Sequence, residues 1–282
     1  GKGLRQAPRD ALIAESTDPK ILGLAYGFHK TMDTIGAVIG PILAMILLPI
    51  LNENLRSLFL FSFVASFFAL STLVLFVKEK KEYEKKHSLP KLSLKILPLP
   101  YKVFLVGIAV FALANFSDAF LFLRAQDAGV LTYYIPVLYA LSNIFFAVFA
   151  IIFGKLSDRI GPYKIMIGGY IVFALTQVGF ALIASPWTVW FLFPMYGIFS
   201  AMTEGIQKTI TVRIADPELK GSMLGLMHTT IGIFQLPASV MIGFLWNNVG
   251  FKIPFLLSSG LAVIAAVILI FAFFGIKKQT AI

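Results

Sequence analysis

Eight apolar stretches, each long enough to cross a lipid bilayer, follow one another along the 282 residues of the chain. A membrane-spanning helix needs about 20 predominantly apolar residues. The stretches cover roughly residues 23–50, 58–77, 101–123, 132–153, 165–184, 187–207, 222–246 and 253–276. They contain Gly and Pro, and short polar joints separate them, which is typical of membrane helices. The pattern predicts an all-α, polytopic membrane protein.

The composition supports this fold class. Hydrophobic residues make up 58% of the chain and charged residues 13%, whereas a soluble domain carries about 25% charged residues. An ordinary soluble protein is thereby excluded, and so is a disordered chain, which would combine low hydrophobicity with high charge. The sequence contains no cysteine, which excludes disulfides, thiolate metal sites and a cysteine nucleophile.

The sequence contains no pattern that points to an enzyme. The three histidines, His29, His87 and His228, stand in separate segments without the spacing of metal ligands. Neither a Gly-x₄-Gly-Lys-Ser/Thr phosphate loop nor a nucleophile paired with a base is present in the sequence. We therefore expect no enzyme activity, no metal and no cofactor.

The Lys and Arg residues predict the orientation in the membrane. If the eight crossings alternate sides, 21 of the 24 fall on one side, and only Arg56, Arg124 and Lys252 fall on the other. Cytoplasmic loops carry the excess of Lys and Arg. The sequence thus predicts a multi-pass protein of the cell (inner) membrane with a cytoplasmic C-terminus. Residues 79–100 form a charged cytoplasmic linker, whose lysines fit anionic lipid better than nucleic acid.

A short internal repeat relates the two parts of the chain at a constant offset of 198 residues. Five residues match five others: Asp18, Pro19, Gly23, Gly27 and Thr31 correspond to Asp216, Pro217, Gly221, Gly225 and Thr229. Both copies read as a turn that leads into a helix, with glycines for close helix packing.

The repeat predicts two halves of six helices each. Residues 101–282 would hold the complete C-terminal half, residues 1–78 a stub of helix 4 followed by helices 5 and 6, and residues 79–100 the linker. The chain would then contain eight complete helices of an expected twelve. We expect it to be a fragment of a longer protein that also includes three further helices and most of a fourth.

The joint after the second helix of the C-terminal half reads Gly-Lys-Leu-Ser-Asp-Arg-Ile-Gly, from Gly154 to Gly161. Gly154 permits close helix approach. Asp158, near a helix end, is able to pair with an Arg and with the N-terminus of a neighbouring helix. We expect this segment, with Arg159 and Gly161, to form a clasp that closes the cytoplasmic side.

The first complete helix contains Gly27, Gly36 and Gly40, followed directly by Pro41. Glycines at such spacing allow tight packing, and the proline allows a kink. Plain helix packing is the alternative to a functional role.

Together, the six-plus-six helices, the charged linker and the half-repeat resemble the major facilitator superfamily of secondary transporters, and in particular its prokaryotic drug/proton antiporters. The segment from Gly154 is similar to the family's loop signature, although Pro162 and Tyr163 replace two basic residues. The resemblance implies transport by alternating access, in which two bundles rock about a site near the middle of the membrane.

Two further segments carry the resemblance. The pattern from Gly27 to Pro41 is similar to the family's antiporter signature, with Ala44 and Met45 in place of the usual Gly pair. Residues 1–10 resemble the end of helix 4 in prokaryotic members.

Acidic residues inside the predicted membrane helices are candidate proton carriers, because ionisable groups at that depth are costly and usually functional. Asp33 lies roughly 16 Å into its helix from Leu22, at 1.5 Å per residue. It has no evident partner except His29, one turn earlier. We expect Asp33 to bind the coupling proton or to face the substrate.

Asp118 and Glu204 are the other two candidates for proton coupling. Each has a structural alternative. Asp118 would pair with Arg124 or with a residue outside the chain, and Glu204 would pair with Lys208, four residues later.

Polar and aromatic side chains in the C-terminal half are candidates to line a substrate cavity, although each alone fits ordinary packing as well. They are Asn115, Tyr133, Tyr134, Tyr139, Asn143, Gln177, Tyr196, Thr203, His228 and Gln235.

The sequence as a whole predicts proton-coupled export of a small molecule, with the lipid bilayer, the substrate and protons as partners. Two alternatives remain open. One is an uptake symporter or uniporter for an organic anion, contacted by Arg5 or Arg9. The other is a membrane receptor or scaffold without transport.

Overall fold

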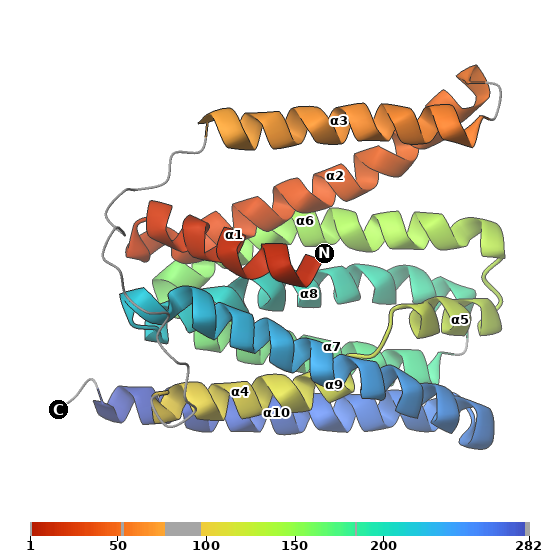
Figure 1. Cartoon of the computed structure of the whole chain (residues 1–282). Coiled ribbons are helices and arrows are strands. Elements are labelled where there is room, and N and C mark those ends of the chain that lie inside the picture. Colours follow the sequence, from red (N-terminus) through yellow and green to blue (C-terminus); the bar gives the residue numbers. More distant parts are fainter. Residues whose placement is uncertain (1, 52–53, 77–96, 184, 280–282) are drawn as a thin grey trace. The chain divides into compact units, whose positions relative to one another are not determined.

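The computed structural model describes residues 2–51, 54–76, 97–183 and 185–279 (Figure 1). These residues form helices joined by short turns, and none of them is in a strand. The helices are α1 (Lys2–Ser16), α2 (Leu22–Ile50), α3 (Leu55–Phe76), α4 (Leu99–Ala114), α5 (Ala119–Asp127), α6 (Ile135–Ile160), α7 (Pro162–Leu182), α8 (Pro186–Ile214), α9 (Lys220–Val249) and α10 (Lys252–Gln279). Short 3₁₀ helices lie at η1 (Pro19–Ile21), η3 (Thr132–Tyr134) and η4 (Pro217–Leu219).

The chain divides into two compact units. Unit 1 contains residues 1–34 and 92–282, and unit 2 contains residues 35–91. Unit 2 thus holds the second part of α2 and all of α3, which exposes Phe59, Phe63 and Phe67 one turn apart. Most of the expected linker, residues 79–100, lies outside the described residues.

In unit 1, α10 packs against α4 and α7 (Figure 1). Aromatic side chains fill the core between these helices. Phe111 of α4 stacks on Tyr170 of α7 with ring centroids 3.8 Å apart, and Phe173 meets Phe111 edge-on. Such contacts add to the stabilisation from buried area alone. Many of the phenylalanines therefore serve packing inside the bundle.

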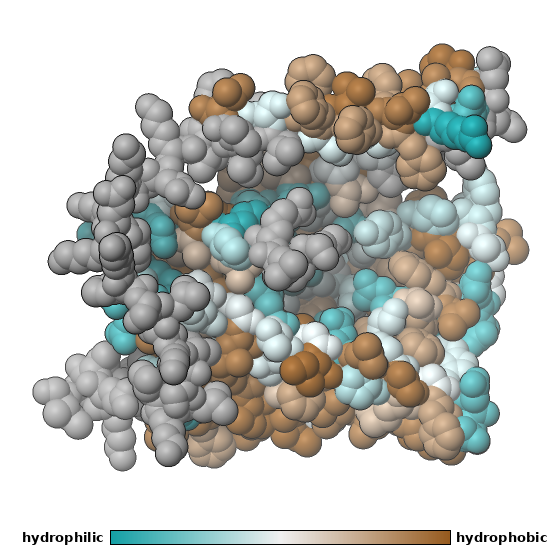
Figure 2. Space-filling model, in the orientation of Figure 1, coloured by the Kyte–Doolittle hydropathy of each residue, from teal (hydrophilic) through white to brown (hydrophobic). Residues whose placement is uncertain are grey.

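The outside of unit 1 is also apolar. On α9, Ile233, Leu236, Val240 and Phe244 are all more than 60% exposed and follow a helical spacing of three and four residues. Figure 2 shows apolar side chains over the lower helices α9 and α10, and more polar ones above them, beside α1. An apolar exterior on so large a surface is suited to lipid rather than to water.

Five helical segments among the described residues are long and apolar enough to cross a membrane: Leu99–Asp127, Thr132–Ile160, Pro162–Leu182, Pro217–Val249 and Lys252–Phe273. They include five of the eight expected spans. The other three expected spans form α2, α3 and α8, which are helical, but the count of eight is not confirmed. In α8, hydroxyl side chains together with Glu204 and Lys208 lower the hydropathy.

The element bounds follow the repeat found in the sequence. α1 ends at Ser16 and α8 ends 198 residues later, at Ile214. η1 and η4 begin at Pro19 and Pro217, which are separated by the same offset, and so do α2 and α9, at Leu22 and Lys220. We call α1, η1 and the part of α2 up to Thr34 the first repeat copy, and α8, η4 and α9 the second. The turn end of unit 1 is the end that carries η1 and η4.

One expected helix is broken. The stretch 101–123 was expected as a continuous span, but α4 ends at Ala114 and α5 begins at Ala119. The side chain of Ser258, on α10, donates a hydrogen bond to the carbonyl of Ala114 (2.6 Å), and the side chain of Ser239, on α9, accepts one from the backbone N–H of Ser117 (3.1 Å). Neighbouring helices thus satisfy backbone groups that the break frees, as non-helical backbone within a membrane requires.

Candidate functional site

A cavity of about 870 Å³ lies inside unit 1, between α1, α2, α4, α8 and α9. Its polar lining consists of Gln6, Lys30, Asn115, Asp118, Tyr196, Ser200, Thr203, Glu204, Gln207, Lys208, His228, Thr229 and Gln235. The apolar lining includes the rings of Phe111 and Phe199. This volume suits a small organic molecule.

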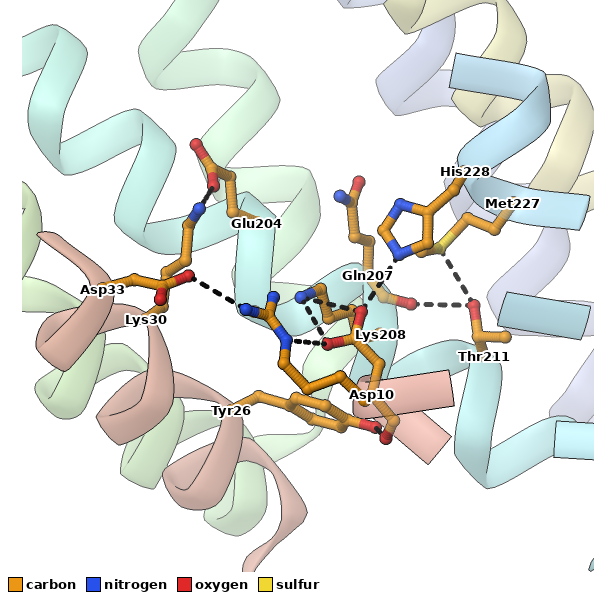
Figure 3. Close-up of polar contacts among 12 residues, drawn as sticks. Asp10, Tyr26, Lys30, Asp33, Glu204, Gln207, Lys208, Thr211, Met227 and His228 are labelled. Atoms are coloured by element: carbon orange, nitrogen blue, oxygen red, sulfur yellow. Dashed lines mark hydrogen bonds and ion pairs between the residues drawn. The ribbon is translucent and has the colours of Figure 1, made fainter. Parts of the chain in front are cut away.

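Asp10 of α1 is completely buried and contacts Lys208 and His228, two residues that line the cavity (Figure 3). Its carboxylate lies 2.9 Å from Nζ of Lys208 and 3.0 Å from Nε2 of His228. Nε of Arg9 is 3.7 Å away, and the hydroxyl of Tyr26 donates to the Asp10 backbone carbonyl at 2.6 Å. A buried carboxylate is stable only with such partners.

Lys30 of α2 pairs with Glu204 of α8 at 2.6 Å (Figure 3). The expected pair of Glu204 with Lys208, four residues later, is therefore wrong. Lys208 is bound instead by Asp10, and its side chain is only 7% exposed. A lysine buried this deeply needs a buried counter-charge, whereas the side chain of Glu204 is 42% exposed.

Asp118 occupies the break between α4 and α5 and faces the cavity. Tyr196 of α8 donates a hydrogen bond to its carboxylate at 2.6 Å. Within the described part of the chain, no Lys, Arg or His lies within ion-pair distance of this acid. Asp118 is therefore the acid of the cavity with a hydrogen-bond donor but no cation.

Arg124 is not the partner of Asp118, contrary to one of the two alternatives considered for this acid. Its guanidinium is buried, donates to the backbone carbonyls of Phe180 and Ile183 at 3.0 Å each, and lies 3.7 Å from the centre of the Phe251 ring. These contacts tie α5 to the end of α7, so Arg124 holds helix ends together.

Asp33 has a partner that the sequence did not reveal. Its carboxylate lies 3.6 Å from Nη1 of Arg9, and its side chain is 46% exposed. It is not among the residues that line the cavity. The ion pair of Asp33 is therefore with Arg9 of α1, and not with His29, the neighbour one turn earlier in α2.

Asp158 makes the contacts that its position near the end of α6 suggested. Its carboxylate accepts hydrogen bonds from the backbone N–H groups of Gly23 and Leu24, both at 2.9 Å, at the N-terminus of α2. Arg213 of α8 lies 2.8 Å from the same carboxylate. The acid thus joins α6, α2 and α8, where the helix dipole of α2 favours a negative charge.

Two comparisons with known proteins bear on this arrangement. The sequence model of the Major Facilitator Superfamily matches residues 1–236 and, a second time, residues 134–281. An uncharacterized MFS-type transporter of Methanocaldococcus jannaschii is 38% identical over 277 residues, which cover 96% of this chain and 69% of that protein.

The chain belongs to the Major Facilitator Superfamily. It is a multi-pass membrane protein of a family of transporters. Weaker similarity links it to the multidrug resistance protein MdtG of Proteus mirabilis, 26% identical over 87% of this chain and 63% of that protein. The multi-drug resistance efflux pump PmrA of Streptococcus pneumoniae is 25% identical over 59% of this chain and 42% of that protein.

Within this superfamily member, Gly154 of the loop signature and Gly27 of the antiporter-like motif lie at a very close crossing of α6 and α2. A Cβ atom added to Gly154 would lie 2.4 Å from the carbonyl oxygen of Gly23, and one added to Gly27 would lie 2.4 Å from that of Ala150. Gly161 ends α6 with a φ of 99°, which favours glycine. Arg159 is exposed in the last turn of α6.

Three residues of the antiporter-like motif, Gly36, Gly40 and Pro41, lie in the part of α2 that belongs to unit 2. Their role in the motif stays a prediction. Gly27, in unit 1, is the member for which the structure shows a packing role.

The structure gathers only some of the expected cavity residues. Asn115, Tyr196, Thr203, His228 and Gln235 line the cavity. The others lie elsewhere among the described residues: Tyr133, Tyr134, Tyr139, Asn143 and Gln177. Tyr139 packs edge-on against Phe122, and the Asn143 amide donates back to a carbonyl of its own helix, so both serve local structure.

Sequence reasoning missed Asp10, Lys30 and Lys208 as site residues. Both lysines were counted among the cytoplasmic charges, yet they line the cavity. The repeat offset contained a signal, because Asp10 corresponds to Lys208 and Lys30 corresponds to His228 at 198 residues. Moving two of 21 charges leaves the predicted orientation unchanged.

Proposed function

We propose that this protein exports a small amphipathic molecule in exchange for protons, with Asp118 as the proton-binding acid. The observation that carries the proposal is the position of Asp118 in the cavity, held by the Tyr196 hydroxyl and without a cation. In a membrane interior an unpaired carboxylate is costly. We therefore expect the Asp118 carboxyl group either to carry a proton or to bind a cationic ligand. Proton and substrate then exclude each other, which is the basis of antiport.

The geometry supports the other two candidate acids less. Glu204 is occupied by Lys30 at 2.6 Å. Asp33 pairs with Arg9 and does not line the cavity. An acid that is already neutralised by a cation has little to gain from a proton.

The lining of the cavity fits a molecule with both an apolar and a cationic part. Phe111, Phe199 and Tyr196 form an aromatic wall close to Asp118, with ring centroids of neighbouring pairs 5.3–5.6 Å apart. Aromatic faces attract cations, and Asp118 supplies the counter-charge. The names of the MdtG and PmrA relatives, which refer to multidrug resistance and efflux, agree with such a substrate.

The proposal is tested in proteoliposomes loaded with a fluorescent lipophilic cation, on which a pH gradient is imposed. We expect the gradient to drive the cation uphill, and a protonophore to stop it. Transport that is equally fast with and without the gradient would refute proton coupling. Uphill movement of an organic anion instead of the cation would favour the uptake alternative.

We also propose that the turn end of unit 1 is cytoplasmic, with the C-terminus on the same side, in the inner membrane. The excess of Lys and Arg supports this orientation. Because the sequence has no native cysteine, single cysteines can be placed at Lys20, which is exposed in η1, and at Tyr133, which is 81% exposed in η3. In intact cells, an impermeant thiol reagent should label Tyr133→Cys and spare Lys20→Cys. The opposite labelling would reverse the orientation.

A further inference from the structure

Asp10 and Lys208 are separated by 198 residues, the offset that relates the two repeat copies. Asp10 stands six residues before the end of α1, and Lys208 stands six residues before the end of α8. Both lie roughly 9 Å from their helix ends at 1.5 Å per residue. They therefore occupy equivalent positions in the two copies.

Equivalent residues of two copies touch only where both are beside the axis that relates the copies. The Asp10 carboxylate and Lys208 Nζ are 2.9 Å apart, so this pair marks the axis within unit 1. Identical charges at equivalent positions would repel each other there. The chain instead has an acid at this position in the first copy and a lysine in the second, and the pair is almost fully buried.

The bonds of Asp10 all cross from the first copy to the second, apart from the distant Arg9 Nε and the backbone contact of Tyr26. Lys208 comes from α8 and His228 from α9, so one carboxylate holds both helices of the second copy. The pair of Arg9 and Asp33, in contrast, lies entirely within the first copy.

Lys208 and His228 also line the cavity. A molecule in the cavity thus meets the same two side chains that Asp10 binds. Breaking a buried ion pair from one side leaves an uncompensated charge. The copies therefore stay together at this end until Lys208 finds another counter-charge and His228 another hydrogen-bond partner.

We propose that Asp10 is an axial lock. It positions Lys208 and His228 so that the two repeat copies are held together at the turn end of unit 1, and its bonds to them break when this end opens. The inference rests on the alternating access of the proposed function, but not on proton coupling.

The test measures the distance between spin labels on introduced cysteines at Lys20 and Glu218, which are exposed beside the turns of the two copies. The protein is purified into nanodiscs without substrate and without a pH gradient. Asp10→Asn and Lys208→Gln should each shift the distances towards a longer population. The charge-swapped variant Asp10→Lys/Lys208→Asp should shift the distances back towards those of the parent protein, because it restores the ion pair between the two positions but not the contact with His228.

Asp33→Asn is the matched control, since it removes an ion pair that does not cross between the copies, and it should leave the distances unchanged. If a single variant fails to fold, the doubly neutral Asp10→Asn/Lys208→Gln replaces it and should show the longer population. Parent-like distances in every neutral variant would overturn the proposal. So would a charge-swapped protein as open as the neutral ones. Neither outcome depends on protons driving transport.

Discussion

Two acids of unit 1, the buried Asp10 and the cavity-lining Asp118, are opposites in their surroundings. Asp10 is fully buried with a lysine and a histidine within 3.0 Å, whereas Asp118 faces the cavity with one tyrosine hydroxyl. A carboxylate surrounded by cations is held ionised and serves as a structural link. A carboxylate without one is free to exchange its proton. The nearby cation therefore distinguishes the two acids: Asp10, which has one, links helices, and Asp118, which has none, is suited to couple transport to protons.

The largest effect is expected from Asp118→Asn. The amide keeps the hydrogen bond with Tyr196 but cannot lose a proton, so transport driven by a pH gradient should fall to the level of empty vesicles. Exchange of labelled for unlabelled substrate, which needs no net proton movement, should persist. Loss of both activities, or of neither, would contradict the role given to Asp118.

Giving Asp118 a cation should make it resemble Asp10. The Tyr196 hydroxyl lies 2.6 Å from Oδ1 of Asp118 and 3.4 Å from Oδ1 of Asn115, so Asn115 is a neighbour of this acid. The variant Asn115→Lys should therefore hold Asp118 ionised and reduce gradient-driven transport more than tenfold, an energetic effect above about 1.4 kcal/mol. Asn115→Gln keeps the polarity without the charge and should transport like the parent. Equal loss in both variants would show that packing, and not charge, is responsible.

Removing the hydroxyl beside Asp118 should have a smaller effect. Tyr196→Phe deletes one hydrogen bond, worth about 0.5–1.5 kcal/mol, and should slow gradient-driven transport by at most roughly tenfold. Tyr139→Phe is the control, because Tyr139 lies outside the cavity lining. A Tyr196→Phe protein that transports at the parent rate would mean that this hydrogen bond does not matter for coupling.

The smallest effect is expected from Asp33→Asn. An ion pair that is half exposed contributes about 0–1 kcal/mol, and Asp33 does not face the cavity. Thermal unfolding and gradient-driven transport should both stay close to those of the parent. If Asp33→Asn instead abolished transport driven by the pH gradient, Asp33 would be the proton carrier, as its position deep in a predicted membrane helix suggested.

The sequence predicted the fold class and the repeat well, because both depend on patterns that are local in the chain. The length of the apolar stretches indicated membrane helices, and the offset of 198 residues reappears in the ends of α1 and α8. The clasp of Asp158 could be anticipated because an acid near a helix end has few available partners. The break at Asp118 could not, since hydrogen bonds from α9 and α10 support it.

The partners of the charged residues were the part that the sequence could not supply. Glu204 was assigned to Lys208 because the two are four residues apart, but Lys30 and Asp10 approach from helices far away in the chain. Burial decides which acid pairs with Lys208, because this buried lysine requires a buried counter-charge, which Asp10 provides. Pairs at the repeat offset would have been the one sequence signal for Asp10 and Lys208.

The central claim is that a substrate and a proton compete for Asp118. The most direct measurement follows the pH of a weakly buffered solution of the purified, detergent-solubilised protein while a lipophilic cation is added. The parent protein should release protons in proportion to the cation bound, and Asp118→Asn should bind the cation more weakly and, at concentrations that saturate it, release none. Asp33→Asn should release as many protons as the parent. Proton release by Asp118→Asn equal to that of the parent would place the exchange at another residue.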